Sequence, residues 1–226
     1  MSDILSGVAG LVTGAVAVGG LAHAWRSGPR FRKPELHTID ITHSNWATPM
    51  SPVDFSSAPA VDAGNDAVDE WLFSQGGAPV SWYIKSVLFV GNAHSLVITG
   101  VTPEVRRIPD LVMRSRVYTQ LGGNGYLRRR AYITLTQVGP VVKLFDDENN
   151  ELGSFGLNLD KGDALEFMFC IEAENPGAAY EVSLSLELLV DGKKRAHSVA
   201  DGRHLRVAAC LPDGESYEYP GANMLY

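Results

Sequence analysis

The sequence predicts a mainly β protein, an antiparallel, immunoglobulin-like β-sandwich with one short helix, preceded by a single N-terminal transmembrane helix. Three observations carry this prediction. Apolar residues recur with a period of two from Val80 onward, strong turn formers separate these runs, and residues 4–25 contain no Lys, Arg, Asp or Glu. We therefore expect three parts: a transmembrane and basic juxtamembrane segment (1–33), the sandwich domain (34–210), and an acidic, Tyr-rich C-terminal tail (211–226).

The N-terminal apolar segment is long enough to cross a bilayer. Its 22 residues would form a helix of about 33 Å, and the hydrocarbon core measures about 30 Å. Trp25 at its end suits the headgroup layer. Only Asp3 precedes the segment, whereas four basic residues follow it: Arg26, Arg30, Arg32 and Lys33. The positive-inside rule then places the N-terminus outside the cell membrane and the domain in the cytoplasm.

Two other interpretations of this segment stay open. Ala22-His23-Ala24 resembles the cleavage site of a secretory signal peptide, but the N-terminal flank has no basic side chain. A soluble fold could also bury the segment as a core helix, because it is rich in glycine. If it spans the membrane, Ser6, Gly10 and Gly14 lie four residues apart on one helix face, where small side chains let helices pack closely.

One soluble helix is expected between Asp62 and Gly76. Asn65 or Asp62 could cap its start, acidic residues fill its first turn, and glycines end it. Val68, Trp71 and Leu72 share one face, which we expect to pack on the sheet.

A first strand is expected at residues 37–42, and eight further strands follow the helix. Their predicted ranges are 80–90, 96–107, 112–120, 126–138, 141–145, 165–173, 180–190 and 204–210. Glycine, asparagine and proline connect them with almost no helix between, which favours an antiparallel sandwich or barrel, and the sandwich in particular.

The last third of the domain carries a resemblance. Gly153-Ser154-Phe155, Lys161-Gly162-Asp163-Ala164, Val190-Asp191-Gly192-Lys193, Val199-Ala200-Asp201-Gly202 and Leu205-Arg206-Val207 form a recurring pattern over residues 150–207. The pattern resembles uncharacterised actinobacterial proteins in which a membrane helix precedes a β-sandwich. Where those proteins often have Trp and Pro-Phe, this chain has Tyr180 and His204-Leu205. The resemblance implies a layout and no activity.

Composition excludes some classes of protein. The net charge of −7 argues against nucleic acid as a partner, and no aromatic residues interleave with the basic ones as single-strand binding requires.

The two cysteines, Cys170 and Cys210, are too few for a disulfide scaffold, and both lie in strand-like runs. We expect two reduced, buried thiols, although a single bridge between neighbouring strands stays open.

No motif for catalysis or for a cofactor is found, and we expect neither an enzyme nor a metal site. His37 and His43 are six residues apart, about 20 Å along a strand, which is too far for one ion. His197 and His204 could approach each other across a hairpin, but no further ligand completes a set. The acidic run 146–151 lacks the spacing of a calcium loop and fits a solvated hairpin turn.

A basic cluster is the one candidate site that the sequence offers. Arginines outnumber acids between residues 104 and 130, and consecutive strands usually lie side by side. The candidate residues are Arg106, Arg107, Arg114, Arg116, Arg128 and Arg130. They could form a patch for anionic lipid headgroups or an acidic partner, or a solvated face balanced by acids elsewhere.

These observations together predict a role without chemistry. We expect a non-enzymatic interaction or scaffold module, tethered by one helix at the inner face of the cell membrane, that binds another protein or its own copies. The alternative is an extracytoplasmic or cell-envelope binding module delivered by an N-terminal signal.

Overall fold

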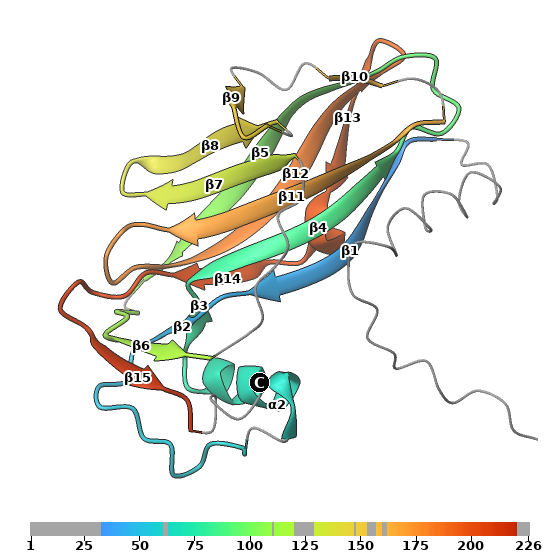
Figure 1. Cartoon of the computed structure of the whole chain (residues 1–226). Coiled ribbons are helices and arrows are strands. Elements are labelled where there is room, and N and C mark those ends of the chain that lie inside the picture. The colour runs from blue at the N-terminus through green and yellow to red at the C-terminus, as the bar shows by residue number, and fades with distance from the viewer. Residues whose placement is uncertain are drawn as a thin grey trace, which may run out of the picture.

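A computed structural model describes residues 33–60, 63–109, 111–119, 129–146, 148–152, 157–159 and 162–220 (Figure 1). The predicted transmembrane helix, its packing face of Ser6, Gly10 and Gly14, and Arg128 lie outside these residues. No helix in the described part of the chain is long and apolar enough to cross a membrane.

The predicted mainly β composition is confirmed. The described elements are β1 (Glu35–His43), β2 (Trp46–Thr48), α2 (Asn65–Ser74), β3 (Ala78–Pro79), β4 (Ser81–Phe89), β5 (Leu96–Ile108), β6 (Ser115–Tyr118), β7 (Arg130–Thr136), β8 (Gly139–Phe145), β9 (Glu151–Leu152), β10 (Leu157–Leu159), β11 (Ala164–Ala173), β12 (Ala179–Val190), β13 (Lys193–Ser198), the 3₁₀ helix η2 (Val199–Gly202), β14 (Leu205–Ala208) and β15 (Glu215–Glu218).

Two sheets face each other across one apolar core. The first has the strand order β1-β4-β11-β7-β8-β9, and the second has the order β10-β5-β12-β13, with β14 also paired to β12. Alternate residues of the long strands point inward, so Ile84, Ile133 and Phe169 from the first sheet join Ile98 and Leu186 from the second in a single cluster. This period-two burial is what the alternating runs of the sequence predict.

A smaller sheet and the helix close one end of this pair of sheets (Figure 1). Its order is β15-β6-β2-β3, and the apolar face of α2 packs on it. Trp46 and Leu72 are fully buried there, beside Val117 and Tyr219. The predicted burial of Val68, Trp71 and Leu72 is confirmed. The residue that caps α2 is Gly64, with no side-chain hydrogen bond, rather than Asn65.

Two strand pairs depart from the antiparallel prediction. β11 pairs with β7 in parallel, and β15 pairs with β6 in parallel. Parallel neighbours need a long connection, and β8, β9 and β10 supply it between β7 and β11. Sequence periodicity reports which residues face the core but says nothing about the direction of the neighbouring strand.

The segment expected as a C-terminal tail also contains a strand. Residues 215–218 form β15, and Tyr219 beside it is only 3% exposed. The Tyr219 hydroxyl donates a hydrogen bond to the carbonyl of Pro59 at 2.6 Å. The tail region up to Tyr219 is therefore part of the small sheet and its core.

The register defines two opposite ends of the six-stranded sheet. Glu35 at the start of β1 lies opposite Phe89, which lies opposite Ala164 at the start of β11. At the other end of β11, Ala173 lies beside Leu135, just before the β7–β8 turn. Nine residues of β11 separate these levels, or about 30 Å. We call the end where β1 begins the proximal end and the end with the β7–β8 turn the distal end (Figure 1).

Candidate functional site

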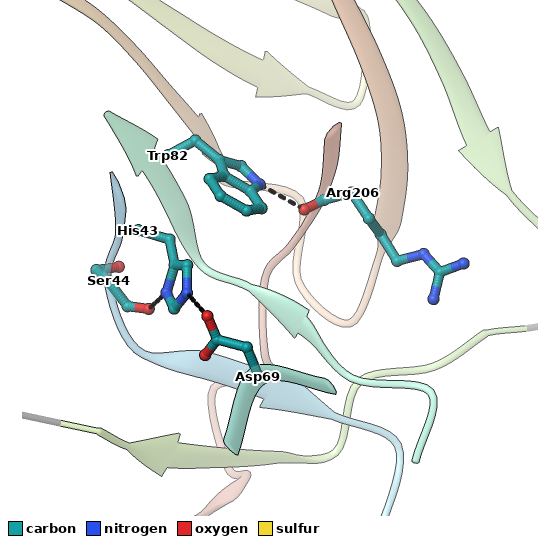
Figure 2. Close-up of polar contacts among 5 residues, drawn as sticks. All are labelled: His43, Ser44, Asp69, Trp82 and Arg206. Carbon is teal, nitrogen blue, oxygen red and sulfur yellow. Dashed lines mark hydrogen bonds and ion pairs between the residues drawn. The ribbon is translucent and has the colours of Figure 1, made fainter. Parts of the chain in front are cut away.

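A buried histidine joins the two-sheet body to the helix. His43 ends β1 opposite Trp82 of β4 and is 8% exposed. Its Nδ1 donates to the carbonyl oxygen of Ser44 at 2.9 Å, and its Nε2 lies 2.7 Å from Oδ2 of Asp69 on α2 (Figure 2). One side chain thus connects the end of β1 to the helix.

The two oxygen atoms that bond to the His43 ring determine whether this histidine has a structural or a catalytic role. Both ring nitrogens face oxygen atoms: the Ser44 carbonyl only accepts, so Nδ1 carries a proton, and Nε2 is engaged by the Asp69 carboxyl group. The rings of Trp46 and Trp82 lie edge-on to it, with centroids 5.2 and 5.1 Å away. Neither nitrogen is left to accept a proton from a nucleophile. We interpret His43 as a structural hydrogen-bonding residue rather than a general base.

Other polar bonds around this junction are also structural. The hydroxyl of Ser44 bonds to the hydroxyl of Ser81 at 2.6 Å and not to the histidine ring. Trp82 Nε1 donates to the carbonyl of Arg206 at 2.7 Å, which connects the first sheet to β14 of the second (Figure 2). The sequence predicts no role for His43 beyond a possible metal ligand, because nothing in it indicates a partner 26 residues away.

The β7–β8 turn exposes apolar side chains at the distal end. Val138 is 96% exposed and Val141 is 42% exposed, with exposed Pro140 between them. We call these three residues the apolar tip. The turn backbone is held locally: the Thr136 hydroxyl donates to the Gly139 carbonyl at 2.8 Å and accepts from the Val138 amide at 3.3 Å.

Folding does not explain the residue types of the apolar tip. Tight hairpin turns favour Asn, Asp and Gly, whose side chains are polar or absent, whereas valine is β-branched and apolar. Val138 has almost no buried surface, so its hydrophobicity contributes nothing to the core. Exposed apolar side chains that lie together on one ordered turn form a candidate binding surface.

The predicted arginine patch is divided among three sheets. Arg106 and Arg107 lie at the end of β5, Arg114 and Arg116 lie at β6, and Arg130 begins β7. Arg106 is paired with Glu181 of β12, and Arg130 donates to Asn149 and lies over the ring of Tyr132. Arg116 bonds to Tyr118, and this bond lowers the pKa of that phenol. The fold thus gives several of these side chains partners of their own.

A second basic cluster, which the sequence analysis did not predict, lies on β13. β13 has the sequence Lys-Lys-Arg-Ala-His-Ser, and Lys193, Lys194 and Arg195 are all exposed. β13 pairs only with β12 among the described strands, so these residues lie on an edge of the second sheet. We call the three residues the basic edge. A count of consecutive basic residues would have found it, but only the fold shows that it is an edge.

The layout of the strands determines which candidate metal ligands lie close together. In the described residues no three His, Cys, Asp or Glu side chains are grouped closely enough to hold a metal ion. β13 and β14 both pair with β12, one after the other, so His197 and His204 do not face each other across a hairpin.

Cys170 and Cys210 are both free. Burial raises the pKa of the Cys170 thiol to about 12 and also raises that of Cys210.

Comparison with known proteins adds no relative. No protein-family model matches the chain, and neither a curated protein nor a solved structure is significantly similar to it. The resemblance to actinobacterial membrane-anchored proteins therefore stays a prediction.

Proposed function

We propose that this chain is a non-enzymatic binding module, tethered by its N-terminal apolar segment at the inner face of the cell membrane, that binds another protein through the apolar tip. We further assign the two facing sheets to the immunoglobulin-like sandwich class. The exposure of Val138 and Val141 on a locally bonded turn is the observation that carries the binding proposal.

The position of the apolar tip supports this proposal. The chain leaves its N-terminal segment at Lys33 and begins β1 at the proximal end, whereas the β7–β8 turn lies at the distal end of the same sheet. A domain held at a membrane through its N-terminus can therefore present the apolar tip away from the lipid, toward a partner in solution.

The two thiols favour the cytoplasmic face of the membrane over an extracytoplasmic location. An extracytoplasmic or cell-envelope binding module would work in an oxidising compartment, where free cysteines are uncommon. Cys170 and Cys210 are both free, and burial keeps their thiols protonated. The free thiols therefore support a location at the inner face of the membrane. The proposed binding surface is the apolar tip on either side of the membrane.

A photo-crosslinking amino acid at position 138 of the full chain, in cells, tests the binding proposal. We expect a discrete adduct with one protein, or with a second copy of this chain, from position 138. The matched control is position 99, since Thr99 is also exposed but lies on the other sheet. Adducts that are equally strong from both positions, or absent from position 138, would contradict the proposal.

A further inference from the structure

The basic edge is a charged surface of the described structure that the proposed function does not use. Five Lys or Arg residues and one acid, Asp201, lie between residues 193 and 206, in a chain whose net charge is −7. Lys193, Lys194 and Arg195 form no ion pair with any described residue. Their charges are therefore available to a partner.

The basic edge lies at the proximal end, beside the strand that leads in from the N-terminus. Lys193 lies opposite Val190, and Val190 lies opposite Leu96, where β5 begins directly after the β4–β5 turn. The same turn follows Phe89, which faces the first residue of β1. β1 also packs against β13 and η2 (Figure 1).

The nearest acids already have partners in the fold. The Asp191 carboxylate accepts the amides of His94 and Ser95, both at 2.9 Å, and the bond from Ser95 lowers its pKa. Glu35 bonds to the ring of His37 at 3.2 Å. The charge of Lys193 contributes to the lowered pKa of Asp191. The basic edge itself places three exposed positive charges at the proximal end.

We infer that the basic edge binds the anionic headgroups of the membrane surface next to the N-terminal anchor. This inference rests on the proposed function. The ten residues from Trp25 to Glu35 span at most about 35 Å, so the proximal end can reach the lipid surface. Cytoplasmic leaflets carry anionic lipid, and each Lys or Arg near such a surface adds attraction. Contact there orients the apolar tip away from the membrane.

The reactivity of individual lysines tests this inference in the full chain. The chain is inserted into vesicles of phosphatidylcholine alone, or into vesicles with a third of the lipid as phosphatidylserine, and then acylated with a water-soluble reagent. We expect the anionic vesicles to slow acylation of Lys193 and Lys194 about fivefold, and molar salt to remove this protection. Lys143 on the first sheet is the internal control and should react equally in both vesicles.

Paired charge-reversal variants separate the basic edge from general charge. Arg195→Glu should reduce the protection of Lys193 and Lys194, whereas Arg107→Glu, equally exposed at the far end of β5, should leave it unchanged. Equal reactivity of Lys193 and Lys194 in both vesicles would overturn the inference, as would protection that requires an added acidic protein. A chain that alkaline carbonate extracts from the vesicles would instead contradict the anchor itself.

Discussion

At the scale of single residues, His43 is the contact on which the arrangement of α2 most depends. Its two bonds join the end of β1 to the helix, and the ring and its carboxylate partner are 6% and 24% exposed at their side chains. Loss of the carboxylate would leave the buried Nε2 of His43 without its hydrogen-bond partner, which costs more than the loss of a surface bond.

We therefore expect Asp69→Ala to lower the free energy of unfolding by about 2 kcal/mol. Asp66→Ala is the matched control, because Asp66 lies exposed in the first turn of the same helix, and its loss should cost less than about 1 kcal/mol. Urea unfolding of the full chain, followed by tryptophan fluorescence, measures both. Equal losses would show that the bond from His43 to Asp69 does not stabilise the fold.

The buried thiol of Cys170 predicts a loss of stability at alkaline pH. Below about pH 9 the thiol is protonated in both the folded and unfolded chain, so it adds no pH dependence. Between about pH 9 and 12 the unfolded thiol ionises while the folded thiol keeps its proton, and the free energy of unfolding falls.

Cys170→Ala should flatten this part of the pH profile. The free energies of unfolding of the wild type and the variant, measured from pH 8 upward, should converge as pH rises. Profiles that stay parallel over the whole range would argue that Cys170 ionises equally easily in the folded chain. The same burial predicts that alkylating reagents modify Cys170 only after unfolding.

At the scale of elements, strands with their own periodic signal were predictable and short ones were not. β12 alternates over twelve residues, β4 and β11 are apolar runs of nine and ten residues, and the predicted ranges match all three closely. β2, β3, β9 and β10 have two or three residues each, too few for a period to be recognised. β13 has no apolar alternation, and its pairing with β12 alone makes it a strand.

The docking of β15 on β6 depends on one close backbone approach. A Cβ atom at Gly214 would lie 2.3 Å from the carbonyl oxygen of Arg114, so only glycine fits there. Gly214→Ala should lower the free energy of unfolding by about 3 kcal/mol. Gly192→Ala is the control, since its φ of +76° strains alanine but its surroundings are open, and it should cost about 1 kcal/mol.

Unfolding of these two alanine variants by urea tests the placement of the C-terminal segment. A larger effect at Gly214 than at Gly192 supports the close approach of β15 to β6. If Gly214→Ala were as mild as Gly192→Ala, residues 211–220 would behave as the loosely held tail that the sequence alone predicts.

At the scale of the whole molecule, the candidate surfaces lie at opposite ends of the two sheets that share one core. The apolar tip is at the distal end, and the basic edge is beside the start of β1 at the proximal end. The sequence predicted neither surface, because both depend on where strands lie in space. Residues 137–138 fall at the end of a predicted strand, yet they form a turn in the structure.

The arginines show the same limit of sequence reasoning. Adjacency along the chain suggested one patch, but the strands that carry these arginines belong to three different sheets. β5 pairs with β12, β6 with β2 and β15, and β7 with β8 and β11, so no two of the three strands are neighbours. The rule that consecutive strands pair does not hold for this part of the chain.

The membrane tether is the central claim, and one fusion experiment tests it most directly. The full chain carries after Tyr226 either a phosphatase that is active only outside the cytoplasm or a fluorescent protein that folds only inside it, and membranes are washed with alkaline carbonate. Our account predicts that both fusions stay in the membrane pellet, the phosphatase inactive and the fluorescent protein bright. A fusion found in the soluble fraction, or an active phosphatase, would contradict it.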